Sequence, residues 1–171
     1  MKQLCLMSIA LLALNASALA QDKLPARKPG LWEITVVSNG QPPSPGMKQC
    51  IDASTDAKLQ EQSAQFGQQC EKQEIRQVGQ TYVTDSICQL SGSRVISHGV
   101  TKGNFSSEYE TEVEARYEPP MFGLKETKTK IKARWTGPCE AGQKPGDTVL
   151  PNGMKINANT FGKKGASASG S

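Results

Sequence analysis

The sequence lacks most of the residue patterns from which catalytic and metal sites are built. Its only histidine is His98, and no two cysteines form a C-x-x-C pair, so the spacing needed for a zinc site is missing. No G-x-S-x-G turn, phosphate-binding loop or dinucleotide fingerprint occurs. We therefore expect no metal, no cofactor and no enzymatic activity. An enzyme of unrecognised type is the weaker alternative, with His98 as its only obvious general base.

The sequence also has only a small excess of charge of one sign, and it has few aromatic residues. The formal net charge is +4 at pH 7, and the 20 basic residues are interleaved with 16 acidic ones. Nucleic-acid binding requires a stripe of unopposed basic residues, so we expect no nucleic-acid partner. Aromatic residues make up 5% of the sequence, which predicts a small hydrophobic core that needs covalent bracing.

The one long hydrophobic run lies at the N-terminus. Leu4–Leu14 follows Lys2 and precedes the small-residue sequence Ala18-Leu19-Ala20. This order is typical of a secretory signal peptide, and the run is shorter than the ~20 residues that span a membrane. We expect residues 1–20 to be cleaved and the mature chain to be periplasmic, or secreted as the alternative, with no transmembrane segment.

Four cysteines remain after the signal peptide, at positions 50, 70, 88 and 139. In an exported domain they predict two disulfide bonds, with three possible pairings. Strand-like runs flank Gly79, and a hairpin centred there places Cys70 opposite Cys88. We therefore predict Cys70–Cys88 and, by elimination, Cys50–Cys139. The second bond would close a loop of about 90 residues and contribute about 4–5 kcal/mol on the chain-entropy argument.

Two runs of strictly alternating residues occupy positions 105–117 and 127–135. Period two is the pattern of a half-buried β-strand. A hairpin that closes about Met121 brings four acids opposite four bases on one face. These pairs, which fix the register, are Glu108–Arg134, Glu110–Lys132, Glu112–Lys130 and Glu114–Lys128. Such partners lower the carboxyl pKa values, whereas a general acid needs a raised pKa.

The remaining pattern predicts a single β-rich domain. Strands are expected at 30–38, 47–51, 70–77, 80–88 and 94–101, and a helix capped by Ser54 or Thr55 is expected to run to Phe66. We predict a mainly β fold of the α+β class. It is an antiparallel meander of about seven strands, in a curled sheet or open barrel with one short helix. Residues 21–29 form a polar leader, 30–147 the domain and 148–171 a flexible tail.

The end of the charged hairpin, residues 117–124, is the clearest candidate for a binding surface. Met121, Phe122 and Leu124 bring three apolar side chains into a turn. In the favoured interpretation they fold back and plug one end of the sheet, because a small core needs the area. In the other interpretation they contact a ligand or partner.

Short motifs at both ends of the domain resemble a known family. Residues 28–34 read KPGLWEI, 47–51 read MKQCI, 135–139 read WTGPC and 145–147 read PGD. Their order and spacing resemble the bacterial family called domain of unknown function 3617, small exported proteins of the cell envelope. The resemblance implies a periplasmic location in a Gram-negative bacterium. It implies no activity, ligand or catalytic residue.

Together these features favour a non-catalytic periplasmic binding or envelope-associated protein. It would hold a small apolar ligand in the bent sheet, or dock on an envelope partner through residues 117–124. The alternative is a structural or stress-related envelope protein without a small ligand.

Overall fold

The structure, a computed structural model, describes residues 23–66 and 70–160 of the 171-residue chain. The expected signal peptide and residues 161–171 of the expected tail lie outside the described residues. Within them, nine strands form one antiparallel sheet in the order β3-β4-β5-β6-β7-β1-β2-β8-β9. The strands are β1 (Gly30–Ser38), β2 (Met47–Ile51), β3 (Cys70–Val78), β4 (Thr81–Leu90), β5 (Ser93–Asn104), β6 (Glu108–Met121), β7 (Leu124–Gly137), β8 (Asp147–Val149) and β9 (Lys155–Asn157).

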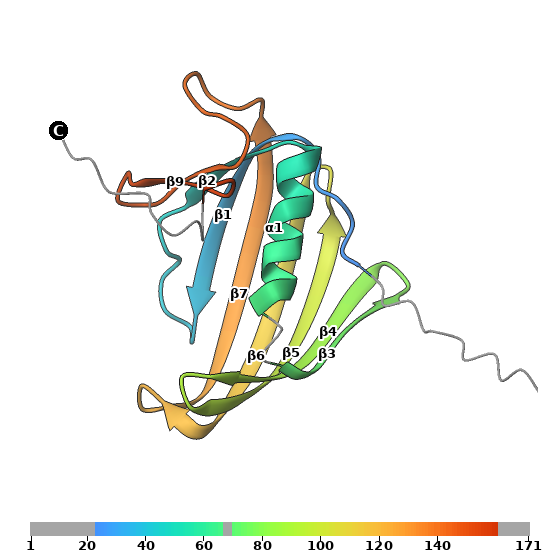
Figure 1. The fold of residues 1–171 in the computed structure, drawn as a ribbon, viewed down its shortest axis with the longest axis vertical. Helices are drawn as coiled ribbons and strands as arrows, with labels where there is room; N and C mark the ends of the chain where they lie inside the picture. The colour runs from blue at the N-terminus through green and yellow to red at the C-terminus, as the bar shows by residue number, and fades with distance from the viewer. Residues whose placement is uncertain (1–22, 67–69, 161–171) are drawn as a thin grey trace, which may run out of the picture.

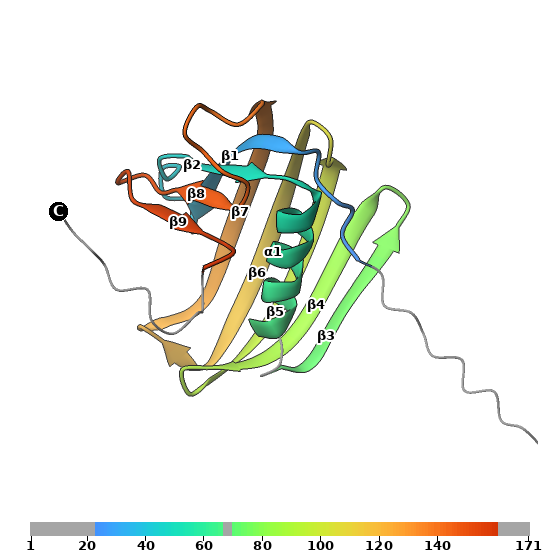
Figure 2. The ribbon, with the colours of Figure 1, turned by 45° about the horizontal axis from the view of Figure 1, so that its top comes forward.

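The sheet curls around a helix. α1 (Ala53–Phe66) lies on the concave face, in front of β5 and β6, as Figures 1 and 2 show from two directions. β3 and β9 are the two edges, so the sheet is open rather than a closed barrel. The predicted mainly β, antiparallel fold with one short helix is confirmed. The described residues hold nine strands, however, where the sequence predicted about seven.

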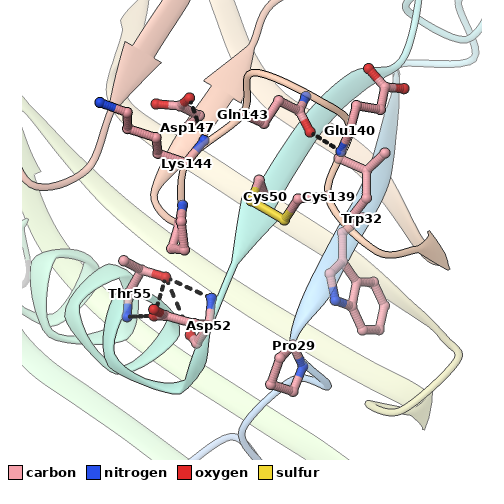
Figure 3. Close-up of a disulfide and its surroundings, with 12 residues drawn as sticks. Pro29, Trp32, Cys50, Asp52, Thr55, Cys139, Glu140, Gln143, Lys144 and Asp147 are labelled. Atoms are coloured by element: carbon pink, nitrogen blue, oxygen red, sulfur yellow. Dashed lines mark hydrogen bonds between the residues drawn. A yellow bond between two sulfur atoms is a disulfide. The ribbon is translucent and has the colours of Figure 1, made fainter.

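The predicted register and both predicted disulfides are present. The acid–base pairs of β6 and β7 run from Glu108–Arg134 to Glu114–Lys128. Tyr109 and Ala133 pack with Leu59 of α1, so these odd-numbered residues face the helix and the charged residues lie on the opposite, outer face. One disulfide, Cys70–Cys88, joins β3 to β4. The other, Cys50–Cys139, joins β2 to the chain just after β7 (Figure 3).

The sequence predicts Ser54 or Thr55 as the cap of α1, but the residue that caps the start of the helix is Asp52. The Thr55 backbone N–H donates to Asp52 Oδ1 (2.8 Å), and the Asp52 N–H donates to the Thr55 hydroxyl (2.9 Å) (Figure 3). This reciprocal pair is a capping box. The Thr55 N–H, followed by the Thr55 and Ser54 hydroxyls, lowers the pKa of Asp52. The predicted cap was wrong by two or three residues, because an aspartate caps a helix as well as a hydroxyl residue does.

The hydrophobic core is small and lies at one end of the sheet, which we call the core end. Its buried residues and the side chains packed on them are Trp32, Ile51, Ala133, Ile34, Leu59, Tyr109 and Trp135. Trp32 is 0% exposed, and its ring centroid lies 5.6 Å from that of Tyr109. Phe105 lies in the β5–β6 turn, not in the predicted strand, and its buried ring stacks on Tyr109 at 4.7 Å.

The segment before β1 is bound to the domain rather than being a separate polar leader. Arg27 donates to the fully buried carboxylate of Asp56 from its backbone N (2.9 Å) and from Nε (2.7 Å). Its Nη1 donates to Gln49 (2.7 Å). The indole N–H of Trp32 donates to the carbonyl of Lys28 (2.8 Å). These contacts could not be predicted from the sequence, because polar groups make them and leave no hydrophobic pattern.

The chain after Cys139 adds two short strands where the sequence predicted a loose tail. β8 pairs with β2, and β9 pairs with β8. Asp147 accepts hydrogen bonds from Asn157 Nδ2 (2.7 Å) and the Lys144 N–H (2.9 Å), with Lys155 Nζ 3.6 Å away. Burial raises the pKa of Asp147, but these partners outweigh it and the pKa lies below its usual value. Each strand has three residues, too few to show a period-two pattern.

Candidate functional site

The β6–β7 hairpin ends in a tight turn. Each of its strands has 14 residues. The ladder shifts register between Arg116 and Met121, and it closes with Met121 opposite Leu124. Phe122 and Gly123 form the turn, with φ values of 51° and 80°. The turn therefore begins one residue beyond the predicted centre, and Phe122 occupies the end of the hairpin.

Phe122 projects into solvent. Its exposed fraction is 90%, that of Leu124 is 45%, and Met121 is half-buried. The favoured interpretation of these residues, a plug folded back onto the sheet, was therefore wrong. A two-residue turn leaves no length of chain with which to fold the Phe122 side chain back over the strands. The other interpretation, contact with a ligand or partner, stays a prediction.

The neighbouring β4–β5 turn adds a third exposed apolar side chain, Leu90, at 50% exposure. In an antiparallel meander, alternate turns lie at the same end of the sheet, and the pairing of Arg94 with Glu118 places this turn beside the β6–β7 hairpin. Figures 1 and 2 show the two turns adjacent. We call Leu90, Phe122 and Leu124 the apolar tip and this end the tip end. The sequence did not single out Leu90, because only the topology brings its turn next to Phe122.

The basic side chains around the apolar tip have acidic partners, with one exception. Arg94 lies 3.4 Å from Glu71 and 4.0 Å from Glu118, and Arg116 lies 3.0 Å from Glu118. Lys125 directly follows Leu124, is exposed, and has no carboxylate partner among the described residues. An anionic group of a ligand or partner at the apolar tip would therefore meet no competing carboxylate at this lysine.

The backbone conformation of Phe122 is unusual for its residue type. Three turns share the same left-handed pair of residues: Asn39-Gly40 (φ 50° and 70°), Ser91-Gly92 (50° and 82°) and Phe122-Gly123 (51° and 80°). The side chain of Asn39 accepts a hydrogen bond from the Lys128 N–H (2.9 Å), a bond that phenylalanine cannot make. The left-handed conformation costs ordinary side chains about 1–2 kcal/mol, and Asn, Asp and Gly are favoured there. Folding alone gives no reason for phenylalanine at position 122.

A shallow groove on the outer face is the second candidate. Its volume is about 520 Å³, and it crosses from β3 to β7. Ile87 and Ile96, which lie opposite each other in the ladder, form its apolar part. The charged and titratable residues around them include Lys72, Asp85, His98, Glu114, Arg116 and Lys128.

His98 lies in this groove with a carboxylate beside it. Its Nδ1 is 2.7 Å from Asp85 Oδ1, and Arg76 also pairs with Asp85. His98, followed by Arg76, holds the pKa of Asp85 below its usual value. The nearby hydroxyls of Ser86 and Ser97 bond to each other (2.6 Å) and alternate onto the opposite face of their strands. The geometry thus gives His98 a carboxylate partner, whereas the hydroxyls of Ser86 and Ser97 lie on the other face of the sheet.

Two acids of the outer face have lowered carboxyl pKa values, the opposite of the shift that a general acid needs. A hydrogen bond from Lys128 lowers the pKa of Glu114, and one from Lys130 lowers that of Glu110. Among residues 23–66 and 70–160, no group of three or more His, Cys, Asp or Glu side chains is placed to hold a metal ion. In the same residues, no helix combines the length and apolar character needed to cross a bilayer.

Residues 27–139 match the family described as protein of unknown function (DUF3617). The chain belongs to this family. The DUF3617 region begins at Arg27, which is bound to Asp56, and ends at Cys139, the disulfide partner of Cys50. Both disulfides and the apolar tip therefore lie inside it, whereas β8 and β9 lie beyond it. No curated protein and no solved structure matches the chain.

Proposed function

We propose that this DUF3617 protein is an exported, non-catalytic envelope protein that acts by binding, and that the apolar tip is its binding surface. The observation that carries the proposal is the 90% exposure of Phe122 at the end of the β6–β7 hairpin. Removing a phenylalanine side chain from water contributes about 1.5–3 kcal/mol. The fold does not use this contribution, so it is available to a partner.

The concave face is the less favourable place for a small apolar ligand. α1 lies against it, and Leu59 packs with the residues of the core. Away from the core, this face carries hydroxyl pairs among its apolar side chains. Thr101 bonds with Thr111 (2.9 Å), and Tyr117 bonds with Thr127 (3.0 Å). We therefore assign binding to the apolar tip and not to the bent sheet.

Export is supported by the cysteine chemistry. Two disulfides brace the domain, and disulfides form and persist in oxidising compartments such as the periplasm. The N-terminal sequence has the order of a signal peptide. A periplasmic location agrees with both.

Photocrosslinking in intact cells tests the binding surface. A photoreactive residue is placed at position 122 and, as a matched control, at position 78. Val78 is also exposed (58%), but it lies beside the β3–β4 turn, at the opposite end of the sheet from the apolar tip. We expect position 122 to give a discrete crosslink, to protein or to lipid, that position 78 does not give. Identical patterns at the two positions, or none, would favour the structural alternative without a ligand.

A further inference from the structure

We propose that the partner of the apolar tip is the surface of a phospholipid bilayer. Phe122, Leu124 and Leu90 enter the apolar edge of the headgroup region, and Lys125 meets lipid phosphate. This inference rests on the proposed function, because it names the partner of the same surface.

The shape of the apolar tip suits a bilayer better than a protein partner. Its three residues lie in or directly beside two separate turns, the β4–β5 and β6–β7 turns. Figures 1 and 2 show these two turns at the same end of the sheet. A stable protein interface buries about 800 Å² on each partner, which three protruding side chains do not supply. A bilayer needs no matching shape, and apolar side chains at any lateral spacing enter it independently.

The backbone of the hairpin end is also suited to an apolar medium. The β6–β7 ladder is interrupted between Arg116 and Met121, where unpaired N–H groups would be expected. Two of the residues in the interruption are Pro119 and Pro120, which have no N–H to leave unpaired. Met121 and Leu124, which flank the turn on its two sides, are paired with each other. Few donors are therefore left without a partner when the hairpin end leaves water.

The charges at the tip end complement a lipid headgroup. Arg94 and Arg116 are held by acidic neighbours, whereas Lys125 has no carboxylate partner among the described residues. Successive residues of a strand point to opposite faces, so Lys125 points away from Glu126. The free cation directly follows Leu124 in the sequence, and the long lysine side chain can keep its charged end at the level of the phosphates while Leu124 enters the apolar layer.

The identity of residue 122 also supports a membrane contact. Its left-handed turn position favours asparagine or glycine, and the neighbouring turn at the same end has Ser91 at the equivalent position. An aromatic residue here opposes local folding preference. Strained residues of this kind cluster at functional sites, and phenylalanine and leucine are among the residues that membrane-surface segments bury at the boundary between headgroups and acyl chains.

The test is flotation of the purified, disulfide-bonded mature protein with vesicles of phosphatidylethanolamine and phosphatidylglycerol. We expect the protein to float with the vesicles. Phe122→Asn should lower the ratio of bound to free protein by about 10- to 100-fold, the loss expected when a phenylalanine side chain no longer enters an apolar phase. Phe122→Trp should retain binding. The control Val78→Ser, at the other end of the sheet, should bind as the unmodified protein does.

Lys125→Gln separates the electrostatic part of the contact. It should weaken binding to vesicles that contain phosphatidylglycerol more than binding to pure phosphatidylcholine vesicles, whose phosphate is balanced by a cationic choline. Thermal unfolding of Phe122→Asn checks that lost binding does not come from lost folding, because the substitution suits the turn.

The inference is overturned if Phe122→Asn floats as well as the unmodified protein, or if Val78→Ser loses as much binding. If the unmodified protein does not float but position 122 still crosslinks to a protein in cells, the bilayer is not the partner and the proposed binding function stands. If neither flotation nor a position-specific crosslink is seen, both proposals fail.

Discussion

Trp32 and Phe122 lie at opposite ends of the same sheet and meet opposite environments. Trp32 is 0% exposed and lies in the core, whereas Phe122 is 90% exposed and lies in the turn at the tip end. All of the described buried hydrophobic residues lie at or near the core end, and the tip end carries the three exposed side chains of the apolar tip. The buried core and the apolar tip thus lie at different ends of the sheet, so the stability of the fold and the exposed surface of the tip can be altered separately.

The disulfides offer the largest test of this contrast. Cys50–Cys139 ties the core end and spans 89 residues, whereas Cys70–Cys88 lies toward the tip end and spans 18 residues. Replacing the core-end pair by serine should cost about 4–5 kcal/mol of unfolding free energy, and replacing the other pair about 3 kcal/mol. Urea unfolding under non-reducing conditions measures both. A larger loss from the Cys70–Cys88 pair would contradict the assignment of stability to the core end.

Removing the two aromatic side chains tests the contrast directly. Trp32→Ala should lower the unfolding free energy by about 3–5 kcal/mol, because it leaves a cavity in a small core. Phe122→Ala should change it by less than about 0.5 kcal/mol, because its side chain contacts mainly water. Urea titrations of both variants give the comparison. Similar losses would show that the hairpin end is part of the stabilising core.

A substitution that suits the turn should stabilise the tip end. Phe122→Asn should raise the unfolding free energy by about 1 kcal/mol, because asparagine tolerates the left-handed conformation. The midpoint of thermal unfolding should rise by about 2–4 °C. Ser91→Asn is the matched control at the neighbouring turn, where serine is already acceptable and a smaller gain is expected. A lower midpoint for Phe122→Asn would mean that the phenylalanine ring contributes to folding.

Long periodic segments were readable from the sequence because their signal is local. The alternation of residues 105–117 and 127–135 predicted the register of β6 and β7, and Gly79 predicted that Cys70 lies opposite Cys88, as the ladders show. Once one disulfide was placed, the other followed by elimination. The family motifs were also readable, because they lie at strand starts and turns.

The features that were missed depend on contacts between distant parts of the chain. β8 is defined by its pairing with β2, about one hundred residues earlier, and Arg27 is defined by the carboxylate of Asp56. The exposure of Phe122 could not be inferred because periodicity carries no information inside a two-residue turn. Leu90 joins the apolar tip only through the order of the strands.

The ion pairs that connect the two ends should have the smallest effects. Glu110, toward the core end, lies between Lys130 (3.0 Å) and Lys132 (3.3 Å), whereas Glu114, toward the tip end, pairs with Lys128 (2.8 Å). Hydrogen bonds from the lysines hold both carboxyl pKa values below the ordinary 4.5. These pairs therefore stabilise the fold above that pKa, and the stabilisation is lost as the pH falls through the folded-state values.

Glu110→Gln should accordingly lower the urea midpoint at neutral pH more than Glu114→Gln does, because it removes two partners rather than one. Both differences from the unmodified protein should shrink as the pH falls below 4.5 and vanish once the pH lies below the folded-state pKa values. They should also shrink in high salt, because exposed pairs are screened over about 10 Å at 0.1 M ionic strength. A larger loss from Glu114→Gln, or a loss that persists in acid and in salt, would mean that these side chains act through packing and not through charge.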